Sequence, residues 1–447
     1  MKHPSLITRK YGGTAIDVAY ELQAHPDLSS KELAGKLHIP KGELLSCYQI
    51  IQKTEELQDI VISKSRYPRL TVSASELLSS HSAYVTDILS GKRVYPLIIE
   101  FHPGPVCQCH CKFCFSLNYE YGEYTNTAKP ISSDRVSQIF KDCRDNGVEE
   151  IWFSGGKEPF VNPETPRYLQ TASKLGFRTR LYTNGIALNQ KAHEAVLSCY
   201  QIRISINGAT PDTYHKVQFP SYSSVSTNGF FEQVKDNVRR LVKLKKERGS
   251  GIKIGLSQIL QPDNHAEMIE FAELARELGA DSVHFRLEAM GMVRDFTPDE
   301  KETIQGEIRK LRNNNYGIEV DIRGVDEGEF ESRETQFLPG LRRPTLCRAG
   351  IIKRGLNPYG ALYYCEFSSH PRFQLTSNHL RLGDTTKESV GEILRRHVGN
   401  YPPPCPLCQA HEYGLNVTLG KLEADLKWGI PVEKQPYYKT RHKGNVR

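Results

Sequence analysis

The sequence predicts an α/β protein built on a parallel sheet, and two features of the chain carry this prediction. From about residue 93, short apolar runs of strand length alternate with amphipathic stretches of helical length. Several of the helical stretches end at a glycine, as helices often do. Six alternations of this kind favour a parallel sheet that is either curled into an open barrel or doubly wound. The expected strands cover residues 97–101, 150–154, 178–183, 202–206, 252–258 and 282–287.

Amphipathic helices are expected between these strands, because apolar residues recur there at helical spacing. They cover residues 133–147, 166–176, 230–249 and 265–279. In a sheet of this type the loops after the carboxyl ends of the strands carry the chemistry. The expected domains are a helical module over 1–92, the α/β unit over 93–300, a charged connecting segment over 301–346 and an extension over 347–447.

The first 92 residues predict three short helices. Ile16, Ala19 and Tyr20 lie on one helical face, and Ser29 with Glu32 forms a capping box at the start of the second helix. Three short helices with a tight middle turn resemble a winged helix-turn-helix. The helix that would serve as the recognition helix of such a module is poor in Arg and Lys, which argues against direct reading of DNA bases. Docking of a substrate, a peptide or a subunit fits this module better.

The composition narrows the class of protein. The apolar runs are only strand-sized, so no membrane span is expected. The start of the chain is not followed by the apolar region of a secretion signal, which favours a cytoplasmic location. Eleven cysteines in clusters favour metal binding or redox chemistry over a disulfide framework. The formal charge of +7 is mild and spread along the chain, so nucleic acid is not an expected partner.

Four of the eleven cysteines lie in the stretch "CQCHCKFCF", directly after the first expected strand. Cys107, Cys111 and Cys114 have the spacing C-x3-C-x2-C. Three thiolates can hold three irons of a 4Fe–4S cluster and leave the fourth iron free for another ligand. Cys109 would then be a spare thiol. A zinc site made from the four cysteines is the alternative, since C-x2-C also suits zinc.

Motifs after the later strands add to the cysteine spacing. They are "SGGKEP" at 154–159, "YTNG" at 182–185, "ISING" at 204–208 and "LQPDN" at 260–264. With the cysteine loop, these motifs resemble the radical S-adenosylmethionine (SAM) superfamily over roughly residues 95–290. The resemblance implies a partial (β/α)6 TIM-type barrel and an enzyme that reductively cleaves SAM to methionine and a 5′-deoxyadenosyl radical. It also implies a flavodoxin- or ferredoxin-type electron donor, and it outweighs the zinc alternative for the first cysteine set.

The resemblance assigns roles to the second motif. Cys107, Cys111 and Cys114 would hold the cluster, and the SAM amine and carboxylate would bind its open iron. Gly155 and Gly156 lack Cβ atoms, so the backbone can approach this ligand closely. Glu158 could accept a charge-assisted hydrogen bond from the methionine ammonium. The commonest family form is "GGEP", and Lys157 lengthens the loop here by one residue.

Further SAM contacts are implied by the later motifs. Ser205 and Asn207 match the positions that usually hold the ribose hydroxyls, and Asn207 stands where an Asp is frequent. Phe113 resembles the residue whose backbone meets the adenine. Turn formation and plain packing are the ordinary alternatives for these three residues.

A charged group is expected at the end of the sixth strand. Strand alternation places His284, Arg286 and Glu288 on one face. Charges on an inward barrel face are costly unless they bind something. We therefore expect Arg286 to contact the SAM carboxylate or the substrate, or to form a salt bridge within the scaffold, and we expect Glu288 to handle protons. Cys47, Cys143 and Cys199 lie in helical contexts and are expected to be core thiols.

A second cysteine set follows the barrel. Cys347, Cys365, Cys405 and Cys408 follow the order C…G-x4-C…C-x2-C, a spacing that alone would also suit zinc. The order resembles the twitch extension of radical SAM enzymes, a shortened form of the SPASM extension. That resemblance implies one auxiliary 4Fe–4S cluster with complete cysteine ligation.

Three main classes of function remain open from the sequence, and a SAM-methylating or molybdopterin-type activity is a further alternative. The first is an enzyme that abstracts hydrogen from a small molecule, such as a sugar, an aminocyclitol or a nucleotide-like metabolite, in a dehydrogenation, deoxygenation or related biosynthetic step. The second is a maturase of a ribosomally made peptide, with the N-terminal module binding the leader of the precursor peptide. The third is an iron–sulfur DNA-binding regulator without turnover. The small-molecule reading is favoured, because the chain has too few cysteines for the second auxiliary cluster of the full SPASM form.

Overall fold

The chain folds into two compact units in the computed structural model. The larger unit comprises residues 95–335 and 350–397, and the smaller unit comprises residues 1–94, 336–349 and 398–447. The structure describes residues 13–24, 28–53, 57, 74–117, 129–221, 229–288, 292–314, 316–323, 325–326, 329–330, 346–370, 380–402 and 410–430.

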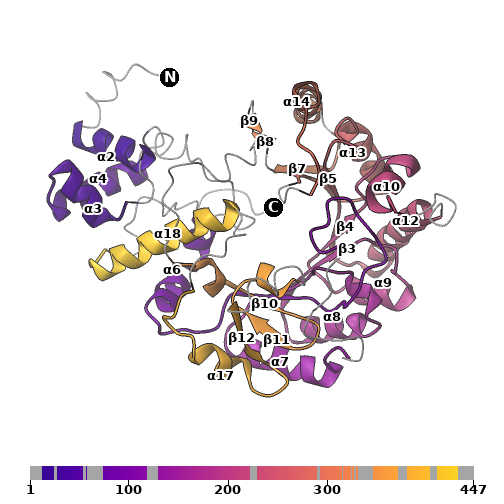
Figure 1. Ribbon diagram of the computed structural model, residues 1–447, viewed down its shortest axis with the longest axis horizontal. Helices are drawn as coiled ribbons and strands as arrows, with labels where there is room; N and C mark the ends of the chain where they lie inside the picture. Colours follow the sequence, from indigo (N-terminus) through magenta and orange to yellow (C-terminus); the bar gives the residue numbers. More distant parts are fainter. Residues whose placement is uncertain are drawn as a thin grey trace. The chain divides into compact units, whose positions relative to one another are not determined.

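The larger unit is built on a ten-stranded sheet with the order β12-β11-β10-β1-β2-β3-β4-β5-β6-β7 (Figure 1). From β10 through β1 to β7 every pair is parallel, whereas β10–β11 and β11–β12 are antiparallel. The strands are β1 (Ile98–Phe101), β2 (Glu150–Phe153), β3 (Arg178–Thr183), β4 (Gln201–Ser205), β5 (Lys253–Leu260), β6 (Ser282–Leu287), β7 (Glu319–Arg323), β10 (Lys353–Leu356), β11 (Ala361–Tyr363) and β12 (Arg381–Asp384). All six expected strands are present, and the predicted partial TIM-type α/β fold is confirmed.

Helices follow the outside of the curved sheet (Figure 1). They are α7 (Ser133–Asp145), α8 (Thr165–Lys174), α9 (Gln190–Val196), α10 (Pro211–Gln218), α12 (Phe230–Arg248), α13 (Met268–Glu277), α14 (Pro298–Asn313) and α17 (Val390–Arg395). Three short 3-10 turns, η1 (Pro159–Val161), η2 (Ala349–Ile351) and η3 (Phe367–Ser369), and a small hairpin of β8 (Val325–Asp326) and β9 (Glu329–Phe330) complete the described elements. The four expected helices correspond to α7, α8, α12 and α13.

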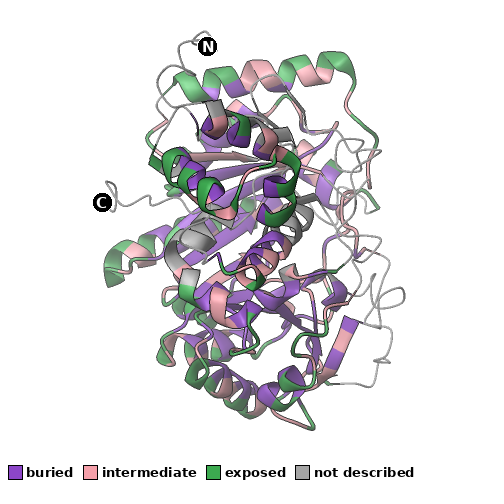
Figure 2. Cartoon of the chain, turned by 90° about the vertical axis from the view of Figure 1, so that its left-hand side faces the viewer, coloured by how far each residue is buried: buried purple, intermediate pink, exposed green. Residues whose placement is uncertain are grey.

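The two faces of the sheet differ in chemistry. The face toward the helices is apolar, with Phe101, Phe153 and Phe285 fully buried on it, and Figure 2 shows the strands as buried ribbon beneath partly exposed helices. Because side chains alternate along a strand, the residues next to these lie on the opposite, inner face. Glu100 and Trp152 are register partners on that face. The barrel interior is therefore lined by polar and charged side chains, as suits a site for a polar ligand.

The smaller unit contains α2 (Gly13–Ala24), α3 (Ser30–Leu37), α4 (Lys41–Lys53), α6 (Ala74–Leu89) and α18 (Ala410–Lys427). The expected capping box is present at the start of α3. Helices α2, α3 and α4 share a small core that includes Leu33 and Tyr48. Both carboxylate oxygens of Asp425, on α18, accept hydrogen bonds from Ser30.

The expected core thiols are confirmed, because Cys47, Cys143 and Cys199 are all buried. Burial raises the pKa of Cys199 to about 12, so its thiol is unreactive. None of the helices in the described parts of the chain has both the length and the apolar character needed to cross a bilayer.

Candidate active site

The cysteine loop follows β1 and gathers its thiols closely. The backbone N–H of Cys109 lies 3.4 Å from Sγ of Cys107, and the Cys109 thiol also contacts the thiols of Cys107 and Cys111. The pKa of Cys107 is raised by its hydrogen bond with Cys109 and by burial, and burial raises the pKa of Cys114. The thiols therefore stay protonated without a metal, and binding of iron would release their protons. This donor set fits an iron–sulfur cluster.

The cysteine loop is hydrogen-bonded to the carboxyl-terminal end of α10. The backbone N–H of His110 donates to the carbonyl of Gln218 at 2.9 Å, and that of Lys112 donates to the carbonyl of Val217 at 3.0 Å. These backbone hydrogen bonds join the loop after β1 to the helix after β4. The loop is therefore fixed by its backbone and not only by its cysteines.

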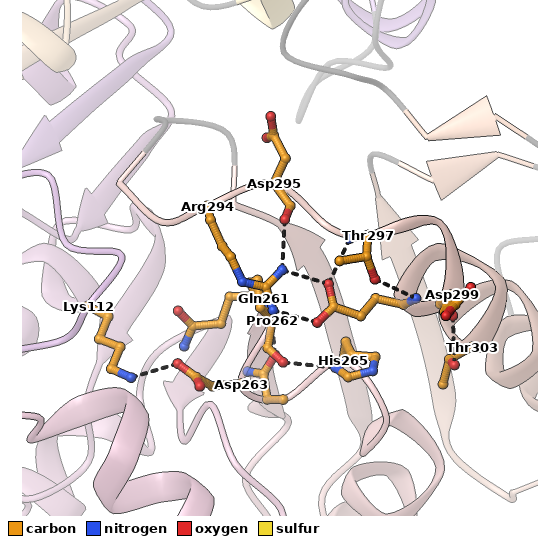
Figure 3. Close-up of polar contacts among 12 residues, drawn as sticks. Lys112, Gln261, Pro262, Asp263, His265, Arg294, Asp295, Thr297, Asp299 and Thr303 are labelled. Atoms are coloured by element: carbon orange, nitrogen blue, oxygen red, sulfur yellow. Dashed lines mark hydrogen bonds and ion pairs between the residues drawn. The ribbon is translucent and has the colours of Figure 1, made fainter.

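A charge pair ties the same loop to the turn after β5. Nζ of Lys112 lies 2.7 Å from Oδ2 of Asp263 (Figure 3). Nζ of Lys216, on α10, lies 2.7 Å from Oδ1 of the same carboxylate. The two ammonium groups lower the pKa of Asp263 against the opposing effect of its burial. The "LQPDN" motif thus reaches the cysteine loop through its aspartate.

Glu158 is buried and held by three donors. Its carboxylate accepts hydrogen bonds from the Phe160 N–H at 3.1 Å, the Thr183 hydroxyl at 2.6 Å and the Asn184 N–H at 2.8 Å. Burial raises the pKa of Glu158, and these donors oppose the shift. A buried carboxylate that is largely but not completely compensated favours binding of a cation such as an ammonium group.

The glycines of "SGGKEP" allow close backbone packing. Gly155 has a φ of +150°, and a Cβ there would lie 3.4 Å from the His102 ring. Gly104, before the cysteine loop, touches the same motif, because a Cβ there would overlap the carbonyl oxygen of Glu158. Lys157 donates from Nζ to the carbonyl of Ser116 at 3.1 Å. The inserted lysine therefore fastens the motif to the segment after the cysteines.

Asn184 links the cysteine loop to Glu158. Its Nδ2 lies 3.8 Å from Sγ of Cys107, its Oδ1 accepts from Gln108 at 3.3 Å, and its backbone binds Glu158. Sequence reasoning assigned no role to Thr183 or Asn184, although both lie in the "YTNG" motif at the carboxyl end of β3. Their position at a strand end beside the SAM motif was the signal that could have found them.

The two expected ribose residues have different surroundings. Ser205 is half-buried, with its hydroxyl 3.2 Å from that of Ser257. Asn207 is almost fully buried with a φ of +60°, and its Oδ1 accepts from the backbone N–H of Ile259 at 2.8 Å. Asn264 in turn donates to the Asn207 carbonyl at 2.9 Å. Asn207 thus joins the ends of β4 and β5, and its contact with ribose stays a prediction.

Of the remaining expected residues, Phe113 lies in the cysteine loop, and His284, Arg286 and Glu288 lie on β6 or directly after it. Phe113, Arg286 and Glu288 are half-buried. His284 is buried, and its ring nitrogens lie 3.0 Å from Asp321 and 2.9 Å from Ser282. Of the predicted charged trio, His284 is therefore engaged within the sheet, whereas the roles of Arg286 and Glu288 remain predictions.

The second cysteine set is described only in part. Cys347 is buried in the smaller unit, and Cys365 is half-buried after β11 in the larger one. Cys405 and Cys408 lie outside the described residues. The auxiliary cluster remains a prediction.

Comparisons with known proteins identify the central domain of the chain. Residues 101–275 match the radical SAM superfamily, whose members use a 4Fe–4S cluster and SAM. A relative from Streptomyces venezuelae, dTDP-4-amino-4,6-dideoxy-D-glucose ammonia-lyase, is 24% identical over 69% of this chain and 65% of its own length. An S-adenosylmethionine-dependent nucleotide dehydratase from Lacinutrix mariniflava is 26% identical over 43% of this chain and 42% of its own length.

The chain thus spans less than two thirds of each of these relatives. The structure of SuiB from Streptococcus suis bound to S-adenosylmethionine superposes with a TM-score of 0.51 and 16% identity, covering 95% of this chain and 91% of SuiB. At that identity the likeness concerns the fold alone. The matched region, the α/β fold and the motifs at its strand ends together assign the domain over residues 101–275 to the radical SAM superfamily.

Proposed function

We propose that the chain reductively cleaves SAM and abstracts a hydrogen atom from a small nucleotide-like or nucleotide-sugar substrate. The observation that carries the proposal is the pair of contacts that Asn184 makes with Cys107 and Glu158. Through them a proposed cluster ligand lies near a buried carboxylate. Bound at three thiolates, the cluster would supply the electron that cleaves SAM. In this proposal Cys107, Cys111 and Cys114 hold it.

The residues of the chain would bind and orient the methionine and nucleoside parts of SAM. Glu158 would accept from the methionine ammonium, with Thr183 and Asn184 keeping its carboxylate in place. Gly155 and Gly156 would let the backbone approach the ligand. Ser205 and Asn207 would face the ribose, and the backbone at Phe113 would meet the adenine.

The substrate class is inferred from the relatives and from one feature of the sheet. The curated relatives are named for a dTDP-amino-sugar, for nucleotides and, in Saccharolobus, for GTP. Arg286 is half-buried near the carboxyl end of β6. Its guanidinium group suits an anionic ligand such as a phosphate. Glu288, two residues beyond Arg286, would handle a proton of the substrate.

A peptide maturase is the second candidate. The helices α2, α3 and α4 share a compact core in the smaller unit, and this helical part could dock a leader peptide. We further propose that Cys347, Cys365, Cys405 and Cys408 bind one auxiliary 4Fe–4S cluster, and that a flavodoxin or ferredoxin supplies the electron.

The test is turnover with the reconstituted, reduced enzyme. It is incubated with SAM and with nucleoside diphosphate sugars, nucleotides, aminocyclitols or peptides in separate reactions. We expect 5′-deoxyadenosine and a mass change in a nucleotide-containing substrate. The triple variant Cys107→Ala, Cys111→Ala, Cys114→Ala, which should lack the SAM-binding cluster, serves as the control. Product formation from peptides alone would overturn the small-molecule proposal in favour of the maturase.

A further inference from the structure

A second group of possible metal ligands lies in the larger unit, apart from the cysteines. Glu100 is on β1, His102 follows that strand, and His370 follows η3 far along the chain. One ligand atom from each of these residues lies within 4.8 Å of the other two, and all three side chains are buried. The parallel pairing of β1 with β10 brings the two segments together.

The three side chains are oriented by their neighbours. Ser154 donates a hydrogen bond to Oε1 of Glu100, and Oγ of Ser369 lies 3.3 Å from Nδ1 of His102. With Nδ1 directed at the serine, Nε2 of His102 faces Glu100, 3.5 Å from its Oε1. The His102 and His370 rings pack with their centroids 4.5 Å apart. Hydrogen bonds of this kind fix the orientation and tautomer of metal-binding side chains.

The charges around the group favour an added cation. Lys353 lies 3.2 Å from Oε2 of Glu100 and also forms a salt bridge with the buried Glu366. Two buried carboxylates thus face one ammonium group, and an uncompensated buried negative charge is costly. Lys353 occupies the Oε2 side of Glu100 and leaves Oε1 on the side of the histidines.

We propose that Glu100, His102 and His370 form a binding site for one divalent metal ion, Zn²⁺ or Fe²⁺, separate from the cysteine clusters. Two imidazoles and one carboxylate are a common ligand set for both ions. Ligands about 2.1 Å from a tetrahedral zinc stand roughly 3.4 Å apart, so the ligand atoms, now within 4.8 Å of one another, need to approach by at most about 1.4 Å. The ion would join β1 to the segment that follows η3. This site does not depend on the proposed reaction.

The experiment uses zinc as the probe on the full chain with its clusters reconstituted. The protein is equilibrated with Zn²⁺, passed through gel filtration, and examined by elemental analysis and zinc-edge X-ray absorption. We expect about one zinc per chain, bound by nitrogen and oxygen without sulfur. The absence of sulfur separates this site from zinc held by cysteines.

Glu100→Gln and His370→Gln should each lower the zinc affinity more than tenfold, because each removes one of three ligands. His193→Gln is the matched control, since His193 is also buried but its ring nitrogens bind the carbonyls of Asn189 and Asn237. Absence of retained zinc in the wild-type chain, zinc bound only by sulfur, or equal affinity in His370→Gln would overturn the proposal. The wild-type absorption spectrum decides the matter even if a variant does not fold.

Discussion

The carboxylate of Glu158 accepts a hydrogen bond from the backbone N–H of Asn184 at 2.8 Å. Because the side chain of the same asparagine reaches Cys107, one residue of the third strand end positions both the buried carboxylate and the first cysteine of the loop. SAM binding and cluster geometry should therefore respond to changes at this strand end.

Removing the Thr183 hydroxyl should weaken SAM binding. Thr183→Val deletes a 2.6 Å hydrogen bond to the buried Glu158 carboxylate while keeping the side-chain shape. A hydrogen bond to a charged group contributes about 1.5–3 kcal/mol, so we expect SAM affinity to fall at least roughly tenfold. The cluster absorbance should be unchanged. Thr171→Val is the control, since its hydroxyl binds only the Arg167 carbonyl on an exposed helix surface. Equal SAM affinity in both variants would refute a role for Glu158.

Breaking the pair between Lys112 and Asp263 should shorten the lifetime of the cluster. Asp263→Asn removes the charge that ties the cysteine loop to the turn after β5. The pair is partly exposed, so the free energy of unfolding should change by less than about 1 kcal/mol. Loss of cluster absorbance in air should nevertheless become several-fold faster. Asp236→Asn, which breaks an exposed pair with Arg239 on α12, should leave the lifetime unchanged.

Glu300 should give the stability of the larger unit a dependence on acid pH. It pairs with Arg294 and caps α14, and these contacts lower its pKa to about 2, with Arg294 the main cause (Figure 3). A lowered folded-state pKa stabilises the fold above the unfolded value and loses that effect as pH falls from roughly 4.5 toward 2.

Glu300→Gln should therefore be less stable than the wild type at pH 7, and this difference should shrink at pH 3. Urea unfolding of both proteins at the two pH values measures it. The neighbouring Asp299→Asn serves as the control. A difference that grows on acidification would contradict the assignment.

The auxiliary cluster can be tested by metal content and spectroscopy. Seven cysteines arranged as three and four predict about eight irons per chain after anaerobic reconstitution. Cys365→Ala with Cys408→Ala should lower the iron to about four, keep the SAM-dependent change in the spectrum of the first cluster, and abolish product formation. A soluble double variant that lacks the second cluster but turns over normally would show that this cluster is not needed.

Local patterns in the sequence were sufficient for the central sheet and for the cysteine loop. All six expected strands formed, because apolar residues recur within each short run and are buried on the face of the sheet that packs against the helices. The capping box of Ser29 and Glu32 was also predictable from the sequence, because both partners lie within one helical turn of each other. The cysteine spacing and the strand-end motifs gave the superfamily.

Only the tertiary structure decided which distant segments meet. The pairing of β10 with β1, the hydrogen bonds from Ser30 to Asp425, and the grouping of His370 with Glu100 all join residues that are remote in sequence. None of these has a local signal, because each depends on the packing of whole elements and not on the spacing of neighbouring residues. The sequence by itself therefore determined the strands, the first helices and the family motifs. The tertiary packing determined which distant residues come into contact with them.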